Sequence, residues 1–279
     1  MSAAHQIGYE GTILPVHPSG KKIAGVKSLK SLDAFPGLID AAFVGVNRHA
    51  TLDIVTQLQT FNAGGAICFA SGFSEASEED ATGHDLQTQL ITAAGDMPIL
   101  GPNCYGFLNA FDGCGIWPDQ HGCRKVESGV AILTQSSNIA INLTMQTRGL
   151  PIGYVITCGN QAQTSQSDVG LHLLDDPRVT AIGLHIEGFG DLRSWEALAH
   201  KAHTKYGRYG QVTYLRCLRI LSIFSQMFGS GGPFLACKNG AGHFWPGKNG
   251  AGHFWPGNKK QIPKTNIFLS SRVALPLAG

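Results

Sequence analysis

Two adjacent serines, Ser136 and Ser137, have the residue types and the position that phosphate binding needs. They follow the apolar run 130–133, and a helix-compatible apolar segment begins at Ile139, directly after Asn138. The first amides of a helix have no partners within the helix, and the helix dipole favours negative charge there. We therefore expect Ser136, Ser137 and Asn138 to hold a phosphate. The competing interpretation is that the serines only cap the helix.

The elements that would position these residues alternate between short apolar strands and helical segments. The expected strands are residues 12–16, 42–46, 66–70, 98–101, 129–134, 154–157 and 180–186. The expected helices are residues 50–61, 77–94, 137–148, 167–175 and 192–205, with Asn47 and Asp191 as caps. Apolar strands separated by helices indicate parallel sheets covered on both faces, with ligands beyond the carboxyl ends of the strands.

Composition sets the class of protein. With 279 residues, of which 43% are hydrophobic and 14% charged, the chain has room for two domains and is not globally disordered. Apolar runs are too short to span a bilayer, and the N-terminus lacks a signal-peptide core, so no membrane partner is expected. Seven cysteines without a CxxC pair are typical of reduced thiols in a cytoplasmic protein, and no metal site is expected.

The charge of the chain changes near residue 208. Residues 1–207 contain all 19 acidic residues, whereas residues 208–279 contain nine basic residues and no acid. The decapeptide KNGAGHFWPG occupies 238–247 and again 248–257. A basic, aromatic tail is compatible with a nucleic-acid or membrane-surface segment. The lost periodicity and the perfect duplication instead favour a disrupted reading frame, so we expect an irregular tail and no nucleic-acid partner.

Several gapped segments, in order, carry a resemblance to a known family. They are GYEGTILPVHP, AFVGVNRHA, CFASGFSE, LGPNCYGFLN, GVAILTQSSNIAIN and DDPRVTAIGLHIEGFGD. Through them, residues 8–206 resemble the NDP-forming acyl-CoA synthetases, which include ADP-forming acetate–CoA ligase and the succinyl-CoA synthetase α subunit. The resemblance implies an α/β fold: a Rossmann-like CoA-binding domain over residues 1–115, followed by a flavodoxin-like CoA-ligase domain over residues 121–207. Both domains are expected to have parallel sheets and to be incomplete.

The resemblance also implies a reaction and its site residues. In this family a carboxylic acid, CoA and ATP give acyl-CoA, ADP and phosphate through an acyl phosphate and a phosphohistidine. The motif matches place CoA against Pro18, Ser19, Val46, Asn47, Ala70, Ser71, Gly72, Pro102 and Asn103. Ser136, Ser137 and Asn138 match the phosphate cradle, and Glu187 matches the acid that orients the phosphohistidine. A carboxylate that accepts an imidazole N–H makes the opposite nitrogen more nucleophilic.

Simpler interpretations compete at several of these positions. Pro102 and Asn103 are also compatible with a plain turn, and Glu187 with a solvated loop acid. The remaining polar residues are interpreted as structural. We expect Asp168, Asp175 and Asp176 to serve caps and turns, His84, His172 and His185 to be ordinary helix or strand residues, and Cys104 to be a small buried residue.

Three departures from the family pattern bear on activity. The first βα unit, with its glycine-rich turn, is missing, which would leave two unpaired strand edges in the first sheet. The strand and catalytic histidine expected after residue 206 are also missing, and His243 and His253 in the repeat only echo a family motif. No ATP-grasp domain is present, so ATP, ADP and Mg would bind a partner subunit.

These departures leave two main hypotheses. The first is a ligase fragment that contributes CoA and phosphate binding and is inactive alone. The second is a non-catalytic CoA-binding or regulatory module. A dinucleotide-binding oxidoreductase is a weaker third hypothesis, because the usual glycine-rich fingerprint is missing.

Overall fold

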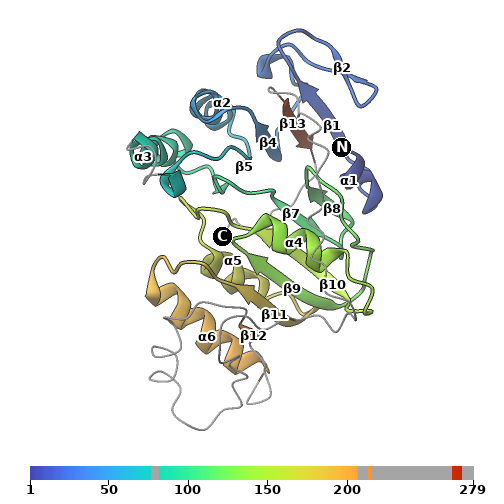
Figure 1. Ribbon diagram of the computed structural model, residues 1–279. Helices are drawn as coiled ribbons and strands as arrows, with labels where there is room; N and C mark the ends of the chain where they lie inside the picture. The colour runs from blue at the N-terminus through green and yellow to red at the C-terminus, as the bar shows by residue number, and fades with distance from the viewer. Residues whose placement is uncertain (77–81, 207–212, 215–265, 272–279) are drawn as a thin grey trace, which may run out of the picture.

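Figure 1 shows the computed structural model, which describes residues 1–76, 82–206, 213–214 and 266–271. Two α/β units follow one another, and most of the expected elements are present. The first sheet has the order β1 (Thr12–Val16), β13 (Asn266–Ser271), β4 (Ala41–Gly45), β5 (Ala66–Cys68) and β6 (Ile99–Leu100). The second has the order β12 (Thr213–Tyr214), β11 (Val179–His185), β9 (Gly129–Thr134), β10 (Ile152–Thr157), β7 (Phe107–Asn109) and β8 (Cys114–Ile116).

Helices α2 (Arg48–Thr60) and α3 (Thr82–Ala94) pack against each other and cover one face of the first sheet (Figure 1). Asn47 caps α2, as expected, because its side chain accepts hydrogen bonds from the amides of His49 and Ala50. Val55 and Leu58 follow at helical spacing and are fully buried among Val44 and other sheet residues. The 3-10 turns Leu32–Ala34 and Ser74–Ala76 and the hairpin of β2 (Lys22–Ile23) and β3 (Val26–Lys27) complete the described part of this unit. The short helix α1 (Ser2–Gln6) instead packs against β8 of the second sheet.

The opposite face of the first sheet packs against the second unit. Ala41, Phe43 and Ile67 alternate along their strands with residues that face α2 and α3, and they join a core that also contains Leu133 and Ile156 of the second sheet. The strand period of two explains this alternation. The two units therefore share one apolar core, which fixes the positions of their strand ends relative to each other.

In the second sheet, β9, β10, β11 and β12 are parallel, in the order β10-β9-β11-β12. Right-handed crossovers place α4 (Ser137–Thr144) on one face and both α5 (Gln166–Leu173) and α6 (Leu192–Tyr206) on the other. Figure 1 shows α4 in front of this sheet. This order is that of the flavodoxin-like folds, as expected.

The parallel strands expected in both sheets are present, and short antiparallel strands join them: β13 pairs with β1 and β4, and β7 pairs with β10 and with β8. Two expectations about the tail need correction. The tail is not irregular over its whole length, because β12 and β13 lie in it. A short strand also follows α6, since β12 pairs in parallel with β11.

Strand β13 lies between β1 and β4, where a gap in the first sheet was expected. It pairs antiparallel with β1 on one side and with β4 on the other, with Phe268 opposite both Pro15 and Phe43. The physical reason is that two facing edges present unpaired backbone groups, which any extended segment can satisfy. The expected two unpaired edges are thus not observed. The repeat with His243 and His253 lies outside the described residues.

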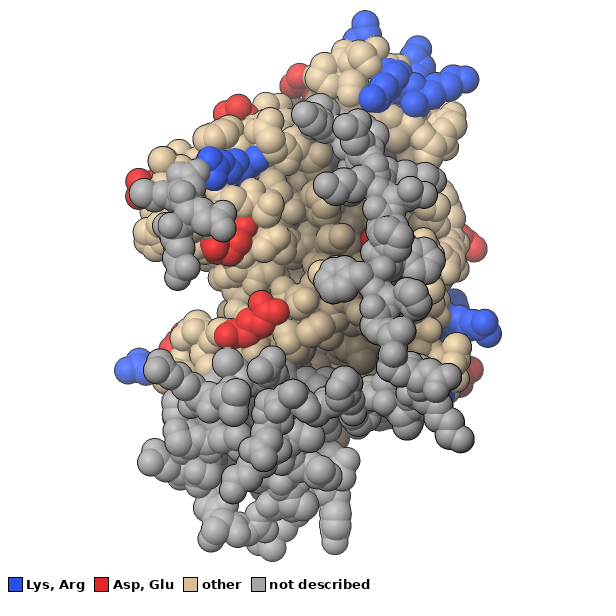
Figure 2. Space-filling view, in the orientation of Figure 1, with Lys and Arg blue, Asp and Glu red and all other residues tan. Residues whose placement is uncertain are grey.

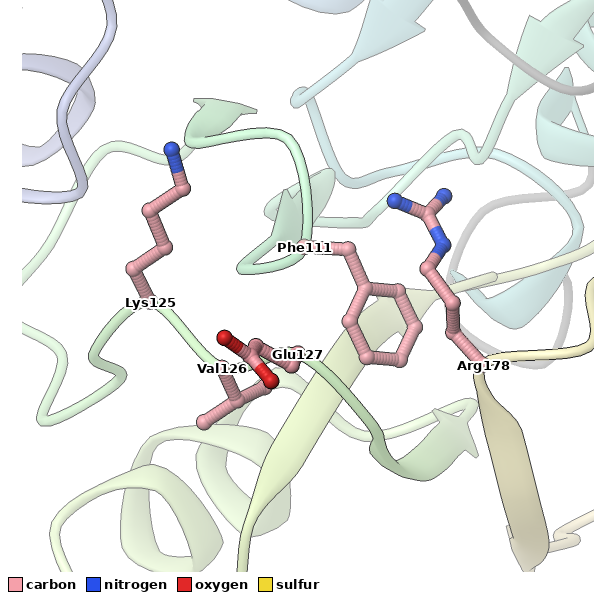
Figure 3. Close-up of a pocket in the computed structure, with 5 residues that line it drawn as sticks. All are labelled: Phe111, Lys125, Val126, Glu127 and Arg178. Atoms are coloured by element: carbon pink, nitrogen blue, oxygen red, sulfur yellow. The ribbon is translucent and has the colours of Figure 1, made fainter.

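An ionic cluster fastens the β7–β8 hairpin to the amino ends of the second sheet. Arg178 forms ion pairs with Asp112 at 2.7 Å and with Asp176 at 2.8 Å, and its guanidinium lies 4.6 Å from the centre of the Phe111 ring. The hydrogen bond from Arg178 is the main cause that lowers the pKa of Asp112 below its ordinary value of 3.8. Arg178 and Phe111 line a depression of about 610 Å³ together with Lys125, Val126 and Glu127. Figure 3 shows these five side chains, with Arg178 beside Phe111.

Replacing Arg178 with glutamine is expected to lower the free energy of unfolding by roughly 0.5–3 kcal/mol, because two carboxylates lose their cation. A lowered carboxyl pKa contributes stability above the unfolded pKa, and that contribution is lost as the pH falls through the folded pKa. Denaturant unfolding should therefore separate parent and variant near neutral pH and bring them together at about pH 2. The exposed Arg193→Gln is the control. An equal gap at both pH values would contradict the role of the ion pairs.

Candidate functional site

The start of α4 forms an amide cup at the carboxyl end of β9. Ser136 has extended backbone angles, φ −102° and ψ 119°, and its side chain makes no capping hydrogen bond. The first helical bond runs from the amide of Ala140 to the carbonyl of Ser136 at 3.2 Å. Among the described residues, none accepts a hydrogen bond from the amides of Ser137 and Asn138. The capping interpretation therefore does not hold for Ser136, and the amides of Ser137 and Asn138 are available to an anion.

The residues at the start of α4 are accessible to solvent, and a buried neighbour holds them in place. Ser136 and Ser137 are half-buried, and Asn138 is exposed. Beneath them Thr134 is fully buried, and its hydroxyl accepts a hydrogen bond from the amide of Ser136 at 2.9 Å. Helix α5, in contrast, has its first amides satisfied by a capping box between Ser165 and Asp168. The difference indicates that only α4 of these two helices leaves its amides to a ligand.

The turn that carries Glu187 lies beside this cup. Strands β9 and β11 are parallel neighbours with Thr134 opposite His185, so the turns that follow them leave the same edge. The side-chain oxygen of Gln135 accepts hydrogen bonds from the amides of Glu187 at 3.0 Å and Gly188 at 2.8 Å. The Glu187 residue itself is exposed. The structure therefore brings the Glu187 turn and the start of α4 to the same edge of the second sheet.

His185 lies under the same turn and is a buried strand residue, as expected. Its Nδ1 lies 3.1 Å from the Thr134 hydroxyl. Burial lowers the pKa of His185, and the charge of Glu187 opposes that shift. The other two histidines interpreted as ordinary, His84 and His172, are exposed on helices.

The residues expected to face CoA lie along one edge of the first sheet. Strands β4, β5 and β6 are parallel neighbours, so Val46–Asn47, Ala70–Gly72 and Pro102–Asn103 all follow carboxyl ends. The amide of Asn103 donates to the carbonyl of Ala70 at 2.9 Å, which joins the second of these turns to the third. Arg48 joins the first to the second, because its guanidinium donates to the carbonyl of Gly72 at 2.8 Å. Pro18 and Ser19 leave the same edge after β1, which β13 separates from β4.

These residues differ in what they offer a ligand. Pro18, Ser19, Asn47, Ser71 and Asn103 are exposed, and Gly72 is half-buried. The side chains of Val46, Ala70 and Pro102 are buried, so any contact from them would come through the backbone. Asn103 has a left-handed backbone with φ +59°. The exposed turns fit the backbone and short-side-chain contacts that an extended anionic ligand needs, and Pro102–Asn103 is both a turn and a candidate contact.

A cluster of lysines beside Pro18 and Ser19 was not among the expected site residues. Lys21, Lys22, Lys27 and Lys30 are all exposed on and around the β2–β3 hairpin, and Figure 2 shows lysine and arginine gathered at that end of the molecule. The signal in the sequence is four lysines within ten residues and no acid among them. Such a patch attracts phosphate groups.

The segment Cys158–Gln163 connects the two sets of turns. The amide of Asn160 donates to the carbonyl of Pro102 at 3.0 Å, and its side chain bonds to the Glu75 carboxylate. Glu75 also accepts hydrogen bonds from the amides of Gly72 at 2.6 Å and Phe73 at 3.2 Å. A turn of the first unit that was expected to face CoA is therefore fastened to a loop of the second unit.

The polar residues interpreted as structural have structural partners. Asp168 completes a capping box, Asp175 pairs with Lys201 at 2.6 Å, and Asp176 pairs with Arg178. Cys104 is 1% exposed, and burial raises the pKa of its thiol to about 12, which leaves it protonated and unreactive at neutral pH. The five described cysteines are free.

The described residues show neither of two other kinds of feature. Within these ranges, no helix combines the length and the apolar character that a membrane span requires. Nor does the described part of the chain bring three or more histidine, cysteine, aspartate or glutamate side chains together as a metal site would.

Two protein families match consecutive parts of the chain. A family described as a CoA binding domain matches residues 2–110. A family described as a succinyl-CoA ligase-like flavodoxin domain matches residues 127–206. The two matches therefore cover the two α/β units that carry the candidate turns.

Curated relatives that match the chain are named as a CoA synthase and as CoA ligases. A trans-feruloyl-CoA synthase from an unknown prokaryotic organism is 29% identical over 203 residues, which cover 71% of this chain and 29% of the relative. The α subunit of an ADP-forming acetate–CoA ligase from Pyrococcus furiosus is 28% identical over 199 residues, which cover 70% of this chain and 42% of the relative. This chain thus spans less than half the length of either relative.

Solved structures share the fold. A dinucleotide-forming acetyl-coenzyme A synthetase from Ca. Korarchaeum cryptofilum superposes with a TM-score of 0.65 at 21% identity, over 77% of this chain and 46% of that one. A protein from Pyrococcus horikoshii superposes with a TM-score of 0.66 at 23% identity, over 76% of this chain and 48% of that one. At these identities the likeness establishes the arrangement of the elements.

Proposed function

We propose that the chain supplies the CoA- and phosphate-binding surfaces of an ADP-forming acyl-CoA synthetase, because its two halves match a CoA binding domain and a succinyl-CoA ligase-like flavodoxin domain. In the proposed reaction a carboxylic acid, CoA and ATP give acyl-CoA, ADP and phosphate. The observation that carries the proposal is that no described residue accepts a hydrogen bond from the amides of Ser137 and Asn138, which lie beside the Glu187 turn.

Each surface has its own role in this proposal. The exposed residues Pro18, Ser19, Asn47, Ser71 and Asn103, with the backbone of Gly72, hold CoA along the edge of the first sheet. Ser136, Ser137 and Asn138 hold the phosphate, because helix amides and the dipole stabilise an oxyanion. Glu187 orients a phosphohistidine that a partner subunit supplies, because no matching histidine motif was found in this sequence. ATP, ADP and Mg bind an ATP-grasp partner subunit.

A CoA titration followed by an activity assay tests the proposal. The purified chain is titrated with CoA by calorimetry and is then combined with an ATP-grasp subunit of a related ligase, ATP, Mg and a panel of short and medium acids. CoA binding with ATP-dependent acyl hydroxamate supports the ligase role. CoA binding without any product identifies the chain as a non-catalytic CoA-binding module. A chain that binds no CoA contradicts both.

The lysine patch should contribute to CoA affinity, because CoA carries several phosphate charges. Replacing Lys21 and Lys22 with alanine is expected to raise the dissociation constant of CoA by roughly three- to tenfold at low salt and by less at high salt. The control is Arg124→Ala with Lys125→Ala, which removes the same charge from exposed positions of the second unit. Calorimetry at two salt concentrations measures both variants. An equal weakening in both would show a general charge effect and contradict a local contact.

A further inference from the structure

The turn that carries Glu187 is held by buried glutamine side chains from other loops. Gln135 follows β9 and is 8% exposed, whereas Gln166 begins α5 and is fully buried. Neither residue carries charge, and neither is among the matched site residues. A buried amide is costly unless all its groups are paired, so both side chains must find partners at this edge.

The hydrogen bonds of Gln135 specify its orientation and its target. Its oxygen accepts from the amides of Glu187 and Gly188, and its nitrogen donates to the carbonyl of Gly188 at 2.7 Å and to the Gln166 oxygen at 3.0 Å. A flipped amide would face its NH₂ group toward two N–H donors, so only this orientation satisfies all four contacts. Three of the four contacts are to the backbone of the Glu187 turn.

Gln166 in turn fixes Gln135 to the sheet. Its nitrogen donates to the carbonyl of Leu133, at the end of β9, at 2.8 Å and to the carbonyl of His185, at the end of β11, at 3.1 Å. Its backbone amide is bonded to the side chain of Gln161, at 2.8 Å. Through Gln166 and Gln135, the Glu187 turn is therefore held in a fixed position relative to β9, the strand that leads into the start of α4.

From this arrangement we propose that Gln135 is a positioning residue, which holds the Glu187 carboxylate beside a phosphate bound at the start of α4. The inference depends on the proposed function, because it assigns a task to a residue next to that phosphate site. Gln135 lies one residue before Ser136, so a single side chain connects the end of β9, the cup and the turn of the acid.

A double-mutant cycle with inorganic phosphate as the ligand tests this role. With the turn in place, Glu187→Gln removes a negative charge near the bound anion and should tighten phosphate binding about fivefold. In a Gln135→Ala background the turn is no longer held, so the same change should alter the affinity by less than about twofold. Calorimetry of the four chains gives the coupling.

Two further variants separate positioning from general stability. Gln163→Ala is the matched control, because Gln163 makes comparable hydrogen bonds, to the amide of Ile99 at 2.9 Å and the carbonyl of Gly95 at 2.8 Å, away from the Glu187 turn. The effect of Glu187→Gln should persist in that background. If the alanine variant fails to fold, Gln135→Met replaces it, because methionine keeps the length of the side chain without its hydrogen-bonding groups, and the Glu187→Gln effect should be lost in that background too.

The outcomes are distinct. A Glu187 effect that persists at full size without Gln135 overturns the positioning role and leaves the proposed function intact. A parent chain that binds no phosphate overturns the proposed function and this inference together.

Discussion

Ser136→Asp is expected to abolish phosphate binding while stabilising the fold. A carboxylate at the start of α4 would accept the free helix amides and place a negative charge where the ligand's charge must sit. Two unit charges about 4 Å apart interact by about 4 kcal/mol at an effective dielectric constant of 20, so we expect at least a 100-fold loss of affinity. The same carboxylate caps the helix and should raise the free energy of unfolding by about 0.5 kcal/mol.

Calorimetry with phosphate and denaturant unfolding measure the two effects on one preparation. Ser128→Asp is the control, because Ser128 is exposed just before β9 and so adds the same charge away from the cup. It should leave the affinity within about twofold. Unchanged phosphate affinity in Ser136→Asp, or a comparable loss in Ser128→Asp, would contradict a site at the start of α4.

Gly159→Ala is expected to have the largest effect on the junction of the two units. Gly159 has φ +52°, and an added Cβ would lie 2.2 Å from the carbonyl oxygen of Pro102 and 2.7 Å from that of Asn103. Both atoms are backbone, so the Pro102–Asn103 turn would have to move. We expect a loss of about 2–4 kcal/mol in the free energy of unfolding and at least a tenfold loss of CoA affinity.

Gly149→Ala separates the clash from the backbone conformation. Gly149 has φ +76°, and no atom lies within 4 Å of an added Cβ. This control should lose about 1 kcal/mol and keep its CoA affinity. Urea unfolding and CoA titration measure both variants. If Gly159→Ala retained full CoA affinity, the Pro102–Asn103 turn would not be a CoA contact.

Local patterns predicted most of the fold because apolar strands and their turns are marked in the sequence itself. The expected strands 12–16 and 129–134 have the bounds that the structure shows. Helix α4 ends at Thr144 rather than at the expected residue 148. Gly122 packs against this end of the helix so closely that an added Cβ would lie 2.3 Å from the Thr144 carbonyl oxygen. That contact comes from a distant segment, so no helical periodicity could indicate it.

The elements that sequence reasoning missed depend on tertiary pairing. Strands β7 and β8 have three residues each and form only because β10 offers an edge to β7. Strand β13 likewise depends on the facing edges of β1 and β4. Neither case has a sequence signal of its own beyond a short apolar run.

The candidate site, like the fold, could be predicted from the sequence only in part. The anion cup could be predicted because strand, serines and helix are contiguous in the chain. The contacts of Gln135 and Gln166 could not, because glutamine is a common polar residue and its partners here lie 19–53 residues away. Only the fold brings these amides to the Glu187 turn.

The most direct test of the central claim is a phosphate titration of ¹⁵N-labelled protein that follows the backbone amides by NMR. The account predicts saturable shifts at Ser137 and Asn138, with smaller shifts at Glu187 and Gly188, and none at these amides in Ser136→Asp. Saturable shifts confined to other residues, or no shift at Ser137 and Asn138 at millimolar phosphate, would contradict it.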